Sequence, residues 1–433
     1  MIFKKQNKIY MLNIASNLTT CLGFFACQAC TDCLKSTLKQ QVRLSYILFD
    51  GVFVFLAIAI TYWLSGVLSS TGWMSTLLRD FIHCPADSDL SCLGVSAIYR
   101  ISFALVIFHI VILIFVLMRN GCSKVFNEEV WPFKVLFVVA ACVGLFFISN
   151  SFFQVYSKIA MMLSLFFLIF QIIMIIDLFY LWGGNWIEKY DEGQSCYMYL
   201  LIIATALLYG GTIYWTVMSY KWFGGCGIGT FANTTNVVFI VLNAVLIFIG
   251  INPSGSLLTS AAVSCYSTYL IWSGLSNMNE TCNSLLTEEF TTIFHLVFGL
   301  VFIITSLVYV SVGDSDSSTG QVAIAKGALA DKEPLQNDPD LEERMITRLR
   351  NYELKAYEGN SFIYFHIIML VACCYVAMLL TNWGSPVISG QAFFQFQAST
   401  MSMWIKIVAA WITMALYTWT LIAPRIFPDR DFS

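Results

Sequence analysis

Charged residues are scarce in this sequence of 433 residues, and their scarcity excludes a water-facing surface over most of the chain. Asp, Glu, Lys and Arg make up 11% of the residues, less than half of the roughly 25% that soluble domains carry. Basic residues are not in excess, because 23 Lys and Arg stand against 26 Asp and Glu. A nucleic-acid-binding protein would show a basic patch or stripe, so we expect no nucleic-acid partner.

Signatures of catalysis and cofactor binding are also absent. The sequence holds no HExxH, GxSxG or P-loop pattern, and the glycine-rich stretch 224–229 lies between two apolar runs, where we interpret it as a turn. The four histidines are dispersed, and we interpret each as a hydrogen-bonded interior residue: His83, His109, His295 and His366. We therefore predict that the protein is not an enzyme and has neither a cofactor nor a metal site.

Apolar residues are what the chain has in abundance, at 58% of the sequence with a mean hydropathy of +0.74. Ten runs are long enough to cross the roughly 30 Å hydrocarbon core as helices. Runs such as 161–176 are apolar on every face, which excludes the alternating strands of a membrane barrel. We predict an all-α, polytopic integral membrane protein. The ten runs cover approximately 44–68, 98–118, 131–150, 159–182, 197–220, 234–251, 256–277, 290–312, 362–382 and 402–424.

Two segments differ from the rest in composition. Residues 1–43 form a Cys-rich N-terminal segment, whose run Met11–Cys30 is partly or fully inserted in the membrane, followed by a cytosolic loop. The loop 313–361 holds 16 of the 49 charged residues, and its part 339–358 has the apolar stripe of an amphipathic helix. That helix would lie on the membrane or bind a protein partner, and a merely solvated connector is the alternative.

Lys and Arg gather in alternate loops and in the tail 425–433, which places those parts in the cytosol. The opposite loops, 69–97, 221–233 and 278–289, are poorer in basic residues. They carry the candidate disulfide cysteines and glycosylation sequons that suit an external face. We predict pairing within one loop and between two loops, with free thiols as the alternative. The candidates are Cys84 with Cys92, Cys226 with Cys282, and the sequon residues Asn233 and Asn279. Four further cysteines, Cys21, Cys27, Cys30 and Cys33, have no histidine nearby, so acylation or apolar packing is favoured over zinc.

Ionisable residues inside apolar runs are costly and need a partner or a water path. Asp50, Lys134 and Asp177 lie at one depth, and Lys134 with Asp177 is an allowed ion pair for which Asp50 could compete. The functional interpretation is a polar route for a zwitterion or a lipid headgroup, and the alternative is a pinned helix pair. Arg100 and Lys406 lie near span ends, where we interpret them as snorkelling anchors.

A polar and aromatic stripe occurs in the run 256–277. Its hydroxyls, rings and amide would line a lipid groove or headgroup site, and an aromatic belt with interhelical hydrogen bonds is the alternative. The residues of this candidate lipid contact are Tyr266, Tyr269, Trp272, Ser273 and Asn277.

Several segments together resemble the serine incorporator (SERINC) family. They include YRISFA at 99–104, YSTYLIWSGLSN at 266–277, TNWGSP at 381–386 and the terminal RDFS at 430–433. The resemblance implies about ten transmembrane helices in two bundles joined by long, tilted crossing helices. It further implies handling of membrane phospholipids and sphingolipids, by phospholipid scrambling or by facilitating serine incorporation into phosphatidylserine and sphingolipids, in an endomembrane or the plasma membrane.

Two other functions are compatible with the sequence. One is a structural or accessory subunit of a larger membrane complex, with partners bound through 313–361. The other is a transporter of serine or a small zwitterion, although the sequence shows no half-helix pair or inverted repeat of that kind.

Overall fold

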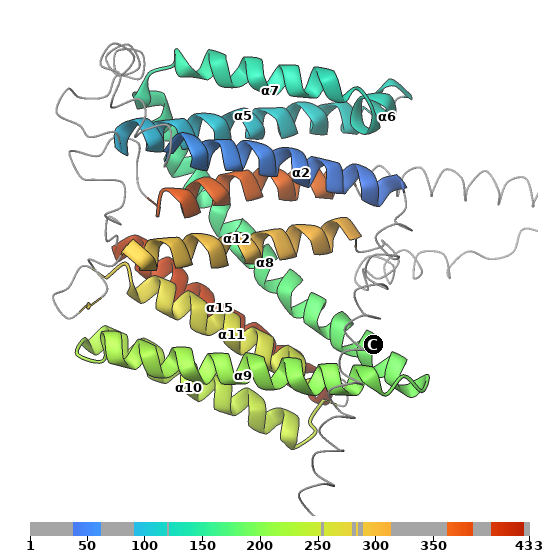
Figure 1. Ribbon diagram of the computed structural model, residues 1–433, viewed down its shortest axis with the longest axis vertical. Coiled ribbons are helices and arrows are strands. Elements are labelled where there is room, and N and C mark those ends of the chain that lie inside the picture. The colour runs from blue at the N-terminus through green and yellow to red at the C-terminus, as the bar shows by residue number, and fades with distance from the viewer. Residues whose placement is uncertain are drawn as a thin grey trace, which may run out of the picture. The chain divides into compact units, whose positions relative to one another are not determined.

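The computed structural model describes residues 38–61, 91–118, 121–252, 255–278, 283–284, 289–312, 362–383 and 400–427. These residues are almost entirely helical, and no strand occurs among them (Figure 1). The prediction of an all-α fold is confirmed. The run Met11–Cys30, the amphipathic stretch 339–358 and most of the predicted external loops lie outside the described residues.

Every predicted apolar run corresponds to a helix. Eight of the described helices are long and apolar enough to cross a membrane; α7 is shorter, and the many hydroxyl side chains of α11 lower its hydropathy. The chain is a multi-pass integral membrane protein. The helices are α2 (Leu38–Ala59), α5 (Ser91–Leu117), the short α6 (Gly121–Glu128), α7 (Trp131–Phe146), α8 (Asn150–Asp191), α9 (Cys196–Phe223), α10 (Gly227–Phe248), α11 (Leu257–Leu275), α12 (Glu289–Val312), a helix at Phe362–Leu380, and α15 (Thr400–Ile426).

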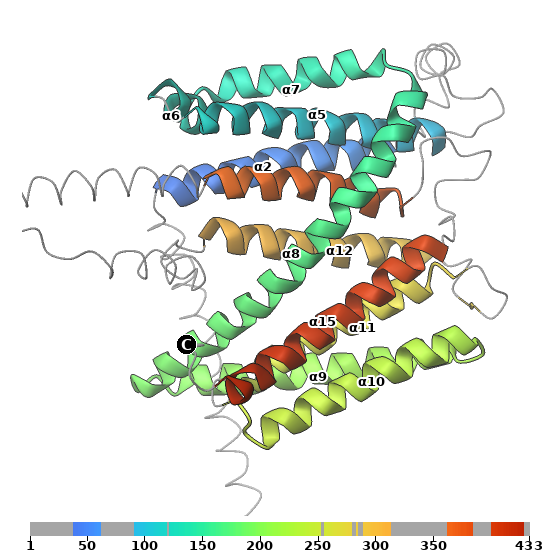
Figure 2. The same cartoon turned by 180° about the vertical axis from the view of Figure 1, so that it is seen from behind.

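Helix α8 is much longer than the run 159–182 that hydropathy predicts. It has 42 residues, which at 1.5 Å per residue makes it about 63 Å long. That is about twice the thickness of the hydrocarbon core, so α8 must be strongly tilted or extend beyond it. Figure 2 shows α8 as one continuous helix.

The chain divides into two compact units. We call the unit made of Leu38–Phe167 and Gly299–Phe393 the Asp50 bundle, and the one that contains Leu168–Phe298 and Phe394–Ser433 the Lys406 bundle. Helix α8 contributes to both, because the division falls at Phe167 and Leu168.

In the Asp50 bundle, α5 packs against α2, α6 and α7. Helix α7 buries only Lys134, Val138 and Leu145, which lie on one stripe of the helix. Most of its other side chains are exposed and apolar, as for Phe133 with 67% of its surface exposed. Since a bilayer surrounds such a helix, these side chains contact lipid acyl chains.

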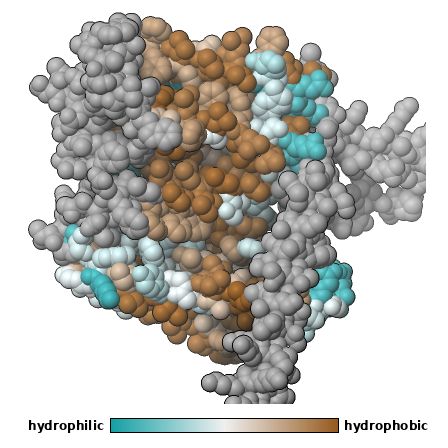
Figure 3. Space-filling view, in the orientation of Figure 1, coloured by the Kyte–Doolittle hydropathy of each residue, from teal (hydrophilic) through white to brown (hydrophobic). Residues whose placement is uncertain are grey.

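In the Lys406 bundle, α11 is the inner helix and packs against α9, α10 and α15. Nearly all of its side chains are buried, from Leu258 to Leu275. The outer helices α9 and α10 carry exposed apolar residues instead, including Ile213 and Val241. Figure 3 shows apolar side chains over much of the described surface on one face of the molecule.

The predicted external loop 221–233 is shorter than the sequence indicated. Helix α9 ends at Phe223 and α10 begins at Gly227, so only residues 224–226 connect them. Gly229 explains the tight connection, because a Cβ atom there would clash with the backbone oxygen of Phe223 and lie 2.8 Å from its Cβ atom. The glycines of this stretch therefore form the predicted turn, and Gly229 also allows α10 to begin close to the end of α9.

Candidate functional site

A hydrogen-bonded series of buried polar side chains runs through the interior of the Asp50 bundle. We call it the polar column, and it consists of Lys134, Asn127, His366, His109, Asp50 and Cys373. It begins at α6, where the ammonium group of Lys134 donates to the backbone oxygen of Asn127 at 2.8 Å. Lys134 also lies 4.3 Å from the ring centre of Trp131 and 4.7 Å from that of Tyr46, so two cation–π contacts stabilise its charge.

The two histidines continue the column toward the bundle centre. His366 Nε2 lies 2.9 Å from Asn127 Oδ1, and it donates there because an amide oxygen only accepts. His366 Nδ1 lies 3.1 Å from His109 Nδ1. With its proton on Nε2, a neutral His366 accepts at Nδ1, so His109 donates. The hydrogen bonds therefore have one direction along this part of the column.

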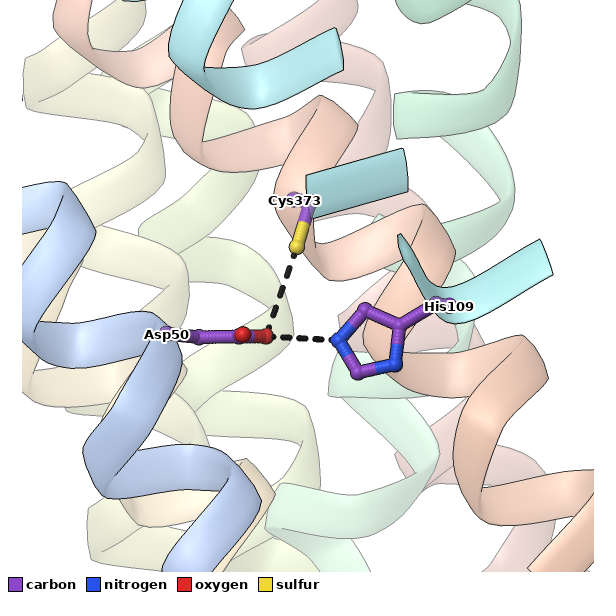
Figure 4. Close-up of side chains that lie close together, drawn as sticks. All are labelled: Asp50, His109 and Cys373. Atoms are coloured by element: carbon purple, nitrogen blue, oxygen red, sulfur yellow. Dashed lines mark hydrogen bonds and ion pairs between the residues drawn. The ribbon is translucent and has the colours of Figure 1, made fainter. Parts of the chain in front are cut away.

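Asp50 and Cys373 are the last members of the column, and Asp50 lies near the middle of α2, about 18 Å from its first residue. His109 Nε2 and Cys373 Sγ lie 2.8 and 3.5 Å from the same carboxylate oxygen, Asp50 Oδ2 (Figure 4). Since the Nδ1 proton of His109 is donated to His366, one proton remains to be shared between His109 Nε2 and Asp50 Oδ2. The other oxygen, Asp50 Oδ1, has no hydrogen-bond partner among the described residues.

The three ionisable residues that the sequence placed at one depth are not all in one bundle. Asp50 and Lys134 belong to the Asp50 bundle, where both are buried and are connected through Asn127, His366 and His109. Asp177 belongs to the Lys406 bundle, and its side chain is exposed. The ion pair of Lys134 with Asp177 stays a prediction, and the described partner of Lys134 is Asn127.

Sequence reasoning treated His109 and His366 as separate interior residues and overlooked Asn127 and Cys373. The two histidines are 257 positions apart in the chain, yet their rings meet. The sequence did contain one signal that the two histidines have polar partners. Both lie inside apolar runs, where an isolated polar ring is costly. Asn127 gave no such signal, since it lies outside those runs.

Arg100 is a buried structural residue, which corrects its interpretation as a snorkelling anchor. Its exposed fraction is 0%. Snorkelling requires a lipid-facing position near a headgroup layer, whereas α5 turns Arg100 toward the inside of its bundle. There the guanidinium donates to Leu145 O at 3.1 Å and to Ile148 O at 2.8 Å. These carbonyls end α7, so Arg100 caps that helix.

The Lys406 bundle holds a second buried polar group, between α11 and α15. We call it the polar seam, and it consists of Ser273, Asn277, Ser402 and Lys406. Asn277 Nδ2 donates to Ser273 O at 2.9 Å and to Ser402 Oγ at 3.2 Å. Lys406 Nζ donates to Ser273 O at 3.4 Å. Lys406 is 7% exposed, so its interpretation as a surface anchor is also wrong.

No carboxylate lies within ion-pair distance of Lys406 among the described residues. An ammonium group has three protons to donate, and the hydrogen bond to Ser273 uses one of them. The carbonyls near the C-terminal end of α11 give partial compensation through their negative potential. A buried cation with two protons that have no acceptor among the described residues is nevertheless suited to binding an anion.

The predicted lipid contact on α11 is buried within the Lys406 bundle. Tyr266 donates to Gln171 Oε1 and Tyr269 donates to His295 O, each at 3.3 Å. Trp272 stacks on the ring of His295 at 4.2 Å. The interhelical hydrogen bonds of the alternative interpretation are present, and lipid contact by these side chains stays a prediction.

Six of the described cysteines fall into two groups. Cys142, Cys265, Cys373 and Cys374 are free thiols, whereas Cys196 and Cys226 are disulfide-bonded. Cys196 begins α9 and Cys226 follows its end, so a helix about 42 Å long separates the two, and they cannot be each other's partner. Cys84 and Cys282 lie outside the described residues, and Cys92 lies in the first turn of α5, so the predicted pairing of these cysteines stays a prediction. Glycosylation of Asn279, which also lies outside the described residues, stays a prediction as well.

The structure argues against glycosylation of Asn233. This residue lies inside α10, is 2% exposed, and accepts a hydrogen bond from Ser219 Oγ at 2.9 Å. A glycan cannot be attached to a side chain that is enclosed between two helices. We expect Asn233→Gln to leave the electrophoretic mobility of the protein from eukaryotic cells unchanged, before and after enzymatic deglycosylation. A faster-migrating Asn233→Gln band would contradict this assignment, and Asn279→Gln serves as the comparison.

Comparison with known proteins gives one consistent result over nearly the whole chain. The profile of the family described as Serine incorporator (Serinc) matches residues 19–430. A "Probable serine incorporator" of Monosiga brevicollis is 28% identical, covering 97% of this chain and 97% of its own. One of Nematostella vectensis has the same identity and coverage. "Serine incorporator 3" of Bos taurus is 26% identical, covering 98% of this chain and 99% of its own.

Proposed function

The chain belongs to the serine incorporator family, and we propose that it moves phospholipids between the two leaflets, with Lys406 in the polar seam as the contact for the headgroup phosphate. A headgroup that crosses a bilayer alone loses its hydration at a cost of several kcal/mol. Polar groups along its way lower that barrier without any covalent chemistry. The names of the relatives refer to serine incorporation, which the family resemblance links to phosphatidylserine and sphingolipids.

The observation that carries this proposal is the buried ammonium group of Lys406 without a carboxylate partner among the described residues. A charge in this position is costly unless an anion compensates it. A lipid phosphate is the anion that a membrane supplies, and its oxygens accept strong hydrogen bonds from an ammonium group.

The depth of Lys406 fits a phosphate as well. Lys406 follows the first residue of α15 by six positions, or about 9 Å along the helix. The bilayer including its headgroups is about 40–45 Å thick around a core of about 30 Å. Lys406 is therefore near the boundary between headgroups and hydrocarbon, where a phosphate enters or leaves the crossing.

We expect Lys406→Met to slow lipid exchange about ten- to a hundredfold, because a lost charge-assisted hydrogen bond is worth about 1.5–3 kcal/mol and about 1.4 kcal/mol is a factor of ten. The protein is reconstituted alone into liposomes with a fluorescent phospholipid, and quenching by dithionite reports exchange. Lys406→Arg keeps the charge and should retain most of the rate. Lys158→Met removes an exposed lysine in α8 and is the matched control.

Two results would overturn the proposal at different points. A wild-type rate equal to that of empty liposomes would exclude scrambling by the protein alone. A wild-type rate in Lys406→Met, with the variant monodisperse and normally folded, would exclude Lys406 as the phosphate contact.

A further inference from the structure

We propose that Asp50, His109 and Cys373 form a binding site for one divalent transition metal ion of the zinc class in the middle of the Asp50 bundle. The three side chains come from α2, α5 and the helix Phe362–Leu380 and point toward one another (Figure 4). All three are buried, and one ligand atom of each lies within 4.8 Å of the others.

The donor set selects the metal. A thiolate, an imidazole nitrogen and a carboxylate oxygen together are ligands that zinc accepts. Calcium and magnesium prefer oxygen ligands throughout, so a cysteine and a histidine disfavour them. Binding also suits the apolar surroundings, because a 2+ ion with one thiolate and one carboxylate has no net charge.

Two of the three distances between ligand atoms are already close to those of a zinc site. Zinc bonds of about 2.0 Å to nitrogen and oxygen and about 2.3 Å to sulfur, at tetrahedral angles, place ligand atoms roughly 3.3–3.6 Å apart. Cys373 Sγ and Asp50 Oδ2 are already 3.5 Å apart. His109 Nε2 lies 2.8 Å from Asp50 Oδ2 and has to withdraw by about half an ångström.

Two further observations favour a metal ion over a simple hydrogen-bonded cluster. Asp50 Oδ1 is buried without a hydrogen-bond partner among the described residues, so the carboxylate has an oxygen available for a metal or its bound water. His109 has the support that metal-binding histidines usually have, because its Nδ1 faces His366 at 3.1 Å and leaves Nε2 to the ligand. His366 is held in turn by Asn127 at 2.9 Å.

The proton balance of binding follows from these hydrogen bonds. The thiol proton of Cys373 and the proton shared between Asp50 and His109 must leave when the metal binds. His109 keeps its Nδ1 proton, which stays directed at His366. The three protein ligands leave a fourth position for water or another small ligand. The site lies in the other bundle from Lys406, so this inference does not depend on the proposed function.

The test is binding of metal to the purified full-length protein after chelator treatment. Cobalt(II) is titrated in, because a cobalt–thiolate bond gives a charge-transfer absorption that other ligands do not, and bound zinc is counted by elemental analysis. We expect the wild type to bind one more equivalent of metal than Cys373→Ser does, with the cobalt–thiolate band reduced accordingly. Cys374→Ser removes the adjacent buried free thiol and should behave as the wild type.

Two more variants keep the test decisive if Cys373→Ser does not fold. His109→Gln should lose the same equivalent, and His366→Gln should bind it about 10–100-fold more weakly, because it loses only the support of a ligand. The proposal is overturned if the wild type binds no more metal than these variants, or if the cobalt–thiolate band depends on Cys374 instead of Cys373.

Discussion

Replacement of Arg100 by alanine is expected to lower the free energy of unfolding by about 4 kcal/mol, because a buried acceptor left unpaired costs about 1–3 kcal/mol and the cavity left by a large side chain costs about 2–5 kcal/mol. The substitution removes the side-chain donors from the carbonyl groups at the end of α7, although Leu145 O still accepts from the backbone N–H of Ile148. It also opens a cavity beside Phe153, whose ring centre lies 4.5 Å from the guanidinium carbon. The lost hydrogen bonds are those to Ser96 O, Leu145 O, Ile148 O and Asn150 Oδ1.

Thermal unfolding in detergent, followed by the intrinsic fluorescence or by the loss of monodisperse protein, checks this expectation. Arg100→Ala should unfold roughly 10 °C below the wild type, and Arg100→Lys should fall between the two, because an ammonium group cannot reproduce the fork of a guanidinium. Arg425→Ala removes an exposed arginine and is the control. Equal unfolding temperatures for Arg100→Ala and Arg425→Ala would show that the cap contributes little.

Replacement of Gly274 by leucine is the second substitution with a large expected effect, and it should prevent α11 and α15 from packing. A Cβ atom at Gly274 would already lie 3.0 Å from Met403 O and 3.1 Å from Ile407 Cγ1. Overpacking by a few methylene groups costs about 1–3 kcal/mol even where side chains can shift. Here one neighbour is a backbone oxygen, so the helices themselves must separate.

We expect Gly274→Leu to give little folded protein and Gly274→Ala to be destabilised by about 1–3 kcal/mol. Gly210→Leu is the matched control, since Gly210 has no atom within 4 Å of a Cβ position and is exposed on α9. That change should be neutral or slightly stabilising, because glycine is a poor helix former. Normal yield and stability of Gly274→Leu would show that the contact between α11 and α15 can be widened at no cost.

Local sequence patterns predicted the helices well, because the need to satisfy backbone hydrogen bonds in lipid makes any long apolar run helical. The same patterns did not predict correctly where some of the helices begin and end. The ends of α8 contain polar residues such as Asn150 and Glu188, so hydropathy places its limits too far inside. The start of α10 looks like a loop because of its glycines, and it is helical since Gly229 allows close approach to Phe223.

The candidate sites were less predictable than the helices. Asp50 and Lys134 were identified because a charge inside an apolar run is conspicuous, but their partners were not. Cys373 and Cys374 are adjacent and both buried, and consecutive residues on a helix point about 100° apart. Only the rotation of that helix in its bundle decides that Cys373 faces Asp50 while Cys374 lies 3.8 Å from the hydroxyl of Tyr156.

The sequence by itself determined that this protein is an all-helical membrane protein of the serine incorporator family, because hydropathy and family motifs are properties of short segments. The tertiary structure alone decided which of its polar residues act together. His109 meets His366 across 257 positions, and Lys406 and Arg100 are buried instead of reaching the surface. The physical reason is that many of these helices are apolar on all faces. The sequence of such a helix does not show which side faces lipid and which side faces the bundle interior, and only the packing of the neighbouring helices decides it.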